Sequence, residues 1–250
     1  MMKLDQLNVA RFRANKVRND LGLSAYEPID IIKVLRENED VSFILKPFES
    51  EISGMFLRLG EISVIVLNTA RSLGHQRFTA AHEYYHLCFD KGMTGRICFV
   101  GSEQTSEREK EADLFAANLL MPAEGIANSI FRRTQGMRGI AIDDVVSLEQ
   151  KFGVSRAAML IRLKQLGYLT DTQYNDMKDW PARHTARILG YSTDLYNPTN
   201  EDAVLSSYAE KVKIAYDAGY ISVGRYRQLL REAGLVDLLY GEEVEPTETV

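Results

Sequence analysis

The chain has 250 residues, of which 45% are hydrophobic and 26% charged, as in ordinary globular proteins. Its formal net charge of -5 argues against nucleic-acid binding through the whole surface. The sequence shows no signal peptide and no long uncharged apolar run, so we expect a cytoplasmic protein without a membrane partner. Its two cysteines, Cys88 and Cys98, are too few for a disulfide framework, which agrees with that compartment.

The first part of the chain predicts two helices followed by a small sheet. The expected helices and strands are, in chain order, at residues 4–21, 28–37, 41–48, 54–59 and 62–68. Gly60 and Glu61 separate the last two strands and predict a tight hairpin between them. The basic residues of the first helix, Arg18 among them, are expected to form a solvated face.

Residues 76–89 predict one uninterrupted helix that carries a metal-binding motif. His82, Glu83 and His86 form H-E-x-x-H, in which two imidazoles four residues apart share one helix face. Both rings can therefore reach a single metal ion. The alternative to a metal site is a buried helix whose two histidines only form hydrogen bonds in the core. Glu83 lies on the shoulder of this face, where it can touch a water on the metal, and we predict that it is the general base.

A catalytic zinc site needs a third protein ligand and leaves its fourth position to water. Residues 106–122 predict a strong helix that ends at a proline. Within it, Glu109 and Asp113 are four residues apart and share a face. Glu107 and Glu111 are the competing carboxylates, although carboxylates on a helix surface are far more often solvated than ligated.

Glu109 and Asp113 resemble the E-x-x-x-D element of thermolysin-like zinc peptidases. In those enzymes the glutamate ligates the metal and the aspartate holds a ligand histidine through its outer nitrogen. The resemblance implies the same two roles here. It also implies that a sheet edge beside the metal helix pairs with an extended substrate, and by this analogy Ile62, Val64 and Val66 are the candidate edge-strand residues.

Two longer blocks extend the resemblance to one family. R-F-T-A-A-H-E-Y-Y-H at residues 77–86 and E-K-E-A-D-L-F-A-A-N-L-L-M-P at residues 109–122 are similar to the ImmA/IrrE metallopeptidases. Tyr85 departs from the pattern, because glycine is often found at that position. The resemblance implies a zinc endopeptidase, with manganese as the alternative metal. It also implies a protein substrate, a helix-turn-helix transcriptional repressor whose cleavage relieves repression in a stress response or mobile element.

Residues 142–152 and 155–166 supply a competing hypothesis. They predict two helices separated by Gly153 and Val154, which resembles a helix-turn-helix unit. Its basic side chains could face DNA: Arg156, Arg162 and Lys164. The apolar residues of the second helix favour packing instead. The alternative to the enzyme is thus a non-catalytic regulatory protein with a structural metal site, which binds DNA or a protein partner through its helical C-terminal half.

Together these patterns predict an α+β fold. A mainly helical zincin-like domain with a small three-stranded antiparallel sheet is expected first, then a helix-turn-helix-like segment and a small helical C-terminal module. The expected boundaries are 1–135 for the catalytic domain, 136–178 for the helix-turn-helix-like segment, 179–202 for a linker, 203–236 for a C-terminal helical hairpin and 237–250 for a disordered acidic tail.

Overall fold

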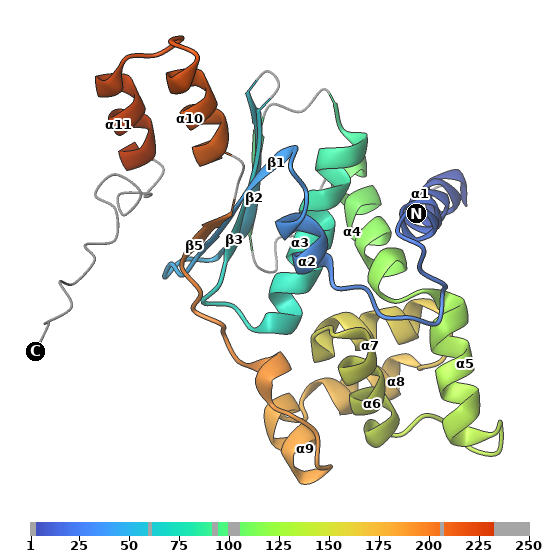
Figure 1. Cartoon of the computed structure of the whole chain (residues 1–250). Coiled ribbons are helices and arrows are strands. Elements are labelled where there is room, and N and C mark those ends of the chain that lie inside the picture. Colours follow the sequence, from blue (N-terminus) through green and yellow to red (C-terminus); the bar gives the residue numbers. More distant parts are fainter. Residues whose placement is uncertain (1–3, 60–61, 92–94, 100–105, 206–207, 233–250) are drawn as a thin grey trace, which may run out of the picture.

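The computed structural model describes the chain except for residues 1–3, 60–61, 92–94, 100–105, 206–207 and 233–250. Within the described part, helices predominate and the strands form one mixed sheet (Figure 1). The fold is therefore α+β, as predicted. The sheet, however, differs from the predicted three-stranded antiparallel one.

The sheet has five strands in the order β4-β2-β3-β1-β5. They are β1 (Val41–Lys46), β2 (Ile52–Leu59), β3 (Ile62–Asn68), β4 (Gly95–Phe99) and β5 (Ala203–Leu205). β3 lies between β1, to which it is parallel, and β2, to which it is antiparallel. The prediction of an antiparallel sheet is wrong because the chain from β1 passes over one strand position before β2 begins, and β3 fills that position.

The interior position of β3 also corrects the expected substrate edge. Ile62, Val64 and Val66 belong to a strand with neighbours on both sides, so the expectation that they lie on a sheet edge is wrong. A central strand whose inner face is buried suits this sequence, since Ile65 and Leu67 alternate with these residues and have no solvent exposure.

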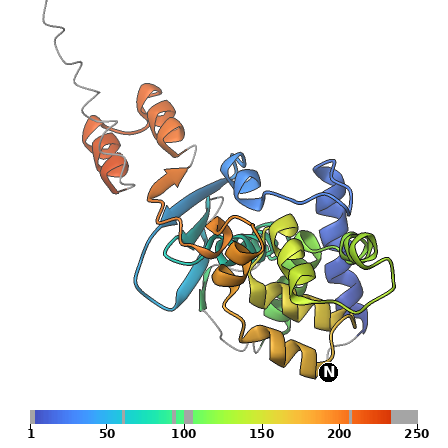
Figure 2. The same ribbon diagram turned by 90° about the horizontal axis from the view of Figure 1, so that it is seen from below.

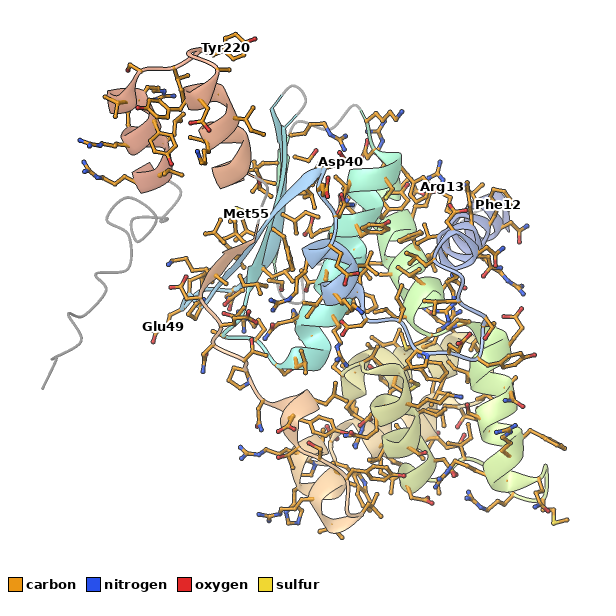
Figure 3. The ribbon with its side chains drawn as sticks, in the orientation of Figure 1. Phe12, Arg13, Asp40, Glu49, Met55 and Tyr220 are labelled. Atoms are coloured by element: carbon orange, nitrogen blue, oxygen red, sulfur yellow. The ribbon has the colours of Figure 1, made fainter. Side chains whose placement is uncertain are left out.

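One face of the sheet is covered by helices from the first part of the chain (Figure 1). α2 (Ile31–Arg36) and α3 (Leu73–Phe89) lie directly on the strands, α4 (Glu107–Leu120) packs against α3, and α1 (Leu4–Asp20) packs against α4. α5 (Ala123–Thr134) follows α4 and packs against the next helical group. Phe43, Phe56 and Ile65 project from the sheet into the core shared with α3 and α4. Met55, one residue before Phe56, belongs to the opposite face, which carries no layer of helices from this group (Figure 3).

The rest of the chain adds a second helical group and a separate hairpin (Figure 2). The elements are α6 (Ile142–Phe152), α7 (Arg156–Gln165), α8 (Asp171–Lys178), α9 (Ala182–Ile188), the 3-10 helix η1 (Asp194–Tyr196), α10 (Tyr208–Asp217) and α11 (Val223–Glu232). The expected linker at 179–202 contains α9 and η1, where Ala186 and Leu195 are buried. α10 packs against α11, and Tyr220 lies at the tip of this hairpin (Figure 3). The acidic tail expected at 237–250 lies outside the described residues.

None of the described helices is long and apolar enough on its own to cross a membrane. Taken together, α4 and α5 pass that test by length and composition, with a bend of 45° between them. Phe115 and Leu119 of α4 and Ile126 of α5 are fully buried in the core.

Two buried arginines hold the C-terminal end of α4. Arg18 of α1 donates a hydrogen bond to the carbonyl oxygen of Leu119 at 2.6 Å. Arg162 of α7 donates to the carbonyl oxygen of Met121 at 3.1 Å and to Oδ1 of Asn118 at 2.7 Å. The last carbonyls of a helix have no partner inside the helix and carry partial negative charge, so a guanidinium group stabilises them. The expectation that Arg18 belongs to a solvated face is therefore wrong.

The basic side chains of α7 do not form a surface for DNA. Gly153, in the left-handed conformation with φ of 66°, joins α6 to α7. Arg156 is buried and donates to Glu149, and Arg162 is buried against α4. Lys164 is exposed and contacts Asp171. The helices and turn are present, but two of the three predicted DNA contacts are wrong.

Asp144 stabilises the start of α6 through hydrogen bonds to its buried carboxylate. It accepts from the backbone N–H of Ala141 at 3.0 Å, from Arg133 Nε at 2.7 Å and from Arg138 Nη1 at 2.5 Å. Burial raises the pKa of Asp144, but the bonds from Arg138, Ala141 and Arg133 outweigh it and lower the pKa to about 2.

We therefore expect Asp144→Asn to reduce stability in a pH-dependent manner. Because the folded-state pKa is lowered, the ionised carboxylate stabilises the fold above about pH 4, and this contribution is lost as the pH falls toward 2. The free energy of unfolding at pH 7 should fall by at most about 2 kcal/mol, since both arginines are partly exposed. Urea denaturation of both proteins at pH 7 and near pH 2 measures the difference. An equal loss at both pH values would mean that the substitution acts through packing.

Candidate metal centre

Helix α3 places His82 and His86 side by side in the interior. Both imidazoles are buried, and their Nε2 atoms are 3.3 Å apart. The ring of Phe56 from β2 stacks on His86, and the ring of Tyr85 meets it edge-on. The tyrosine that departs from the ImmA/IrrE pattern therefore packs directly against one of the two histidines.

Helix α4 brings Glu109 to the histidine pair. Its carboxylate has no solvent exposure; Oε2 lies 3.1 Å from His82 Nε2, and Oε1 lies 3.5 Å from His86 Nε2. Ser106 caps the helix by accepting a hydrogen bond from the Glu109 backbone N–H, which fixes this residue in the first turn. One donor atom from each of the three residues lies within 4.8 Å of the other two.

The outer nitrogen of His82 faces a carboxylate. Asp113 Oδ1 lies 2.8 Å from His82 Nδ1, one helical turn after Glu109. An ionised carboxylate can only accept, so this contact places the hydrogen on Nδ1 and leaves the lone pair of the neutral ring on Nε2. The lone pair then points to the space shared with His86 and Glu109.

Asp90 lies near the outer nitrogen of His86 without a hydrogen bond to it, and the sequence reasoning missed this residue. Its Oδ2 lies 3.5 Å from His86 Nδ1, and its Oδ1 accepts a hydrogen bond from Arg108 at 2.9 Å. Arg58 of β2 donates to the backbone carbonyl of Asp90 at 2.7 Å. The spacing could have revealed this residue, because Asp90 follows His86 by four positions.

The other carboxylates of α4 lie away from the metal-binding atoms. Glu111 accepts a hydrogen bond from Arg13 at 2.5 Å, and Glu107 contacts Lys110 at 3.0 Å. Of the acidic residues considered from the sequence, the structure thus brings Glu109 and Asp113 to the histidines. Glu83 is fully buried in α3, directly after His82.

The donor set fits a zinc ion. A buried carboxylate and the lone pair that His82 directs toward it repel each other unless a cation lies between them. Two histidine nitrogens and one carboxylate oxygen are also a ligand set of catalytic zinc sites, in which the fourth position stays open.

The residues of this site lie in a part of the chain that matches a known protein family. The profile of the Peptidase_M78 family, described as the IrrE N-terminal-like domain, matches residues 36–164, just over half of the chain. The chain belongs to this family. The IrrE-like region contains β1 to β4 and both helices of the metal centre, whereas β5 and the helices from α8 onward lie outside it. No curated protein matches the chain significantly.

We expect Asp113→Ala to weaken zinc binding by about 10- to 100-fold, because loss of the carboxylate frees the His82 ring and lowers the basicity of its Nε2. Chelator competition measures the affinity. Glu111→Ala is the matched control, since it removes a carboxylate from the same helix that contacts Arg13 and not the histidines. Equal zinc affinity in the Asp113→Ala variant and the wild type would mean that Asp113 does not support the ligand.

Proposed function

We propose that this chain is a zinc-dependent endopeptidase, with manganese as the alternative metal. The single observation that carries the proposal is the convergence of His82, His86 and Glu109 in the interior of a peptidase-family domain. Glu83 adds to it, because a purely structural metal site does not need a carboxylate next to its first ligand.

In the proposed mechanism, His82 and His86 would hold the ion through imidazole nitrogens and Glu109 through a carboxylate oxygen. Bound zinc supplies Lewis acidity, which lowers the pKa of a water molecule from about 15.7 toward about 7. Glu83 accepts the proton of the attacking water and returns it to the leaving amine as the peptide C–N bond breaks. Asp113 keeps the His82 imidazole oriented, and the Asp90 carboxylate adds negative charge beside His86.

The substrate would approach the edge of the sheet nearest the metal centre. β2 carries Phe56, which stacks on His86, and β4 lies beyond β2. Within the described residues, β4 has a strand neighbour on one side only. An extended peptide could therefore add to β4 through main-chain hydrogen bonds. This strand replaces β3 as the candidate substrate-binding edge.

We further propose that the substrate is a helix-turn-helix transcriptional repressor, cleaved at a specific site to relieve repression. The support for this step is the ImmA/IrrE resemblance of the two motif blocks. A bound repressor segment in extended form would suit the open edge of β4.

We expect Glu83→Gln to lower the rate of cleavage of a repressor substrate by at least about 100-fold. The zinc content should stay near one ion per chain. The amide keeps the shape of the side chain but cannot take up a proton. His82→Ala should lose both zinc and cleavage. Mass spectrometry of the metal and a cleavage assay on the same samples measure both quantities, and restoration of chelator-treated wild type by zinc is the control. Wild-type cleavage by Glu83→Gln would rule out its assignment as the general base.

The competing regulatory hypothesis makes a different prediction for DNA. Phosphate contacts by the helical C-terminal half would give binding whose affinity falls steeply with salt. Because Arg156 and Arg162 are buried, we expect no such binding in gel-shift titrations with duplex DNA over a range of salt concentrations. A steep salt dependence in the wild type that disappears in a Lys164→Gln variant would favour the regulatory protein.

A further inference from the structure

A second candidate site lies at the beginning of α3. A half-open cavity of about 310 Å³ is bordered there by α2, β1, the first turns of α3 and the segment 197–202 that leads into β5. None of the proposed metal ligands lines it, and neither does Glu83. Its volume is at the lower end of the range for small-molecule sites.

The segment 197–202 is a fixed wall of this cavity. The backbone N–H of Leu73 donates to the carbonyl oxygen of Asn197 at 2.9 Å. The hydroxyl of Thr199 donates to Oε1 of Gln76 at 3.1 Å. These bonds attach the segment to the first turn of α3 and define one side of the cavity.

The carboxylates of the cavity are already engaged. Both oxygens of Glu201 accept hydrogen bonds from Arg36 at 2.7 Å. Asp30 accepts from the backbone N–H of Lys33 at 3.2 Å and so caps α2. Three cationic side chains and two carboxylates line the cavity, so one positive charge is in excess.

Arg77 is the cation without a carboxylate partner. Its Nε is shielded from solvent and has no hydrogen-bond partner among the described residues. The guanidinium of Arg77 packs directly over Gly153, in the turn between α6 and α7. The contact is so close that a Cβ atom on Gly153 would collide with Nη1 of Arg77. Because Nε is shielded, an anion in the cavity would be held by the outer nitrogens of the guanidinium, and its charge would offset the positive charge in excess there.

We propose that the cavity binds a small metabolite that carries an oxyanion, with its charged group on Arg77. A planar guanidinium forms paired hydrogen bonds with carboxylate and phosphate groups alike. Lys33 and Thr199 line the same cavity and offer an ammonium group and a hydroxyl. The bound metabolite stabilises segment 197–202 against α3. This site does not depend on the proposed peptidase activity.

Inorganic phosphate and acetate are the two probes, titrated calorimetrically into the full chain at constant ionic strength, with chloride as the reference salt. Saturable binding with one site per chain is expected for at least one probe. Binding of phosphate alone assigns a phosphorylated metabolite, and binding of acetate alone assigns a carboxylate. Arg77→Gln should weaken the binding about tenfold or more, because a charge-assisted pair of hydrogen bonds is lost.

Arg132→Gln is the matched control, since it makes the same change of charge at an exposed position of α5 that does not line the cavity.

Lys33→Gln alters an exposed residue at the rim of the cavity and should weaken binding a few-fold without affecting the fold. Phosphate or acetate should also slow hydrogen exchange in 197–202. If Arg77→Gln does not fold, the proposal is tested by the affinity of Lys33→Gln and by hydrogen exchange in 197–202. Unchanged affinity together with unchanged exchange would then overturn it. No saturable binding by the wild type, or equal binding by the Arg77→Gln and Arg132→Gln variants, would overturn the proposal.

Discussion

The buried carboxylate of Glu109, facing two buried imidazoles, is the constraint on which the rest of the structure depends. A charge without solvent is unfavourable unless its surroundings are fixed to compensate it. The contacts of Glu109 with His82 and His86 require α4 to lie at one position relative to α3. Aromatic packing between Tyr85 and Phe115 joins the two helices in the core. The metal centre is thus a property of a helix pair.

The position of α4 is maintained from both ends. At its first turn Ser106 caps the helix, and at its last turn Arg18 and Arg162 bind the carbonyls that have no partner within the helix. These two arginines come from α1 and α7, more than forty residues away in either direction. The pair α6 and α7 that resembles a helix-turn-helix therefore supports the helix that carries Glu109, and two of its basic side chains, Arg156 and Arg162, are used inside the protein.

Local spacing explains which parts of this structure could be predicted from the sequence. H-E-x-x-H and the pair Glu109 and Asp113 are four-residue intervals, and helical geometry alone places their members on one face. That the two motifs lie next to each other in space depends on how the helices pack. The sequence analysis takes this arrangement from the family resemblance. Asp90 has the same interval from His86, so it was within reach of the same reasoning.

Contacts between distant segments were beyond that reasoning. β3 lies beside β1 because of a crossover that no local pattern encodes, and β5 comes from three residues of a segment expected to begin a helical hairpin. An arginine is usually exposed, so the sequence predicts a solvated face for Arg18 and allows a DNA contact for Arg162. Their burial depends on the end of α4, which lies far from both in the sequence.

The residues beyond the IrrE-like region decide which edge of the sheet stays open. β5 pairs with β1 and covers that edge, and Lys46 contacts Asp202 beside it. The hydroxyl of Thr69 donates to the carbonyl oxygen of Glu201, which fixes the approach to β5. An uncovered edge strand readily pairs with another chain, so covering β1 removes one such surface. Within the described part of the sheet, this leaves β4 open, and β4 adjoins the strand whose Phe56 stacks on His86. The C-terminal part of the chain therefore covers the edge at β1 and leaves the described edge at β4, on the side of the sheet where the candidate metal centre lies.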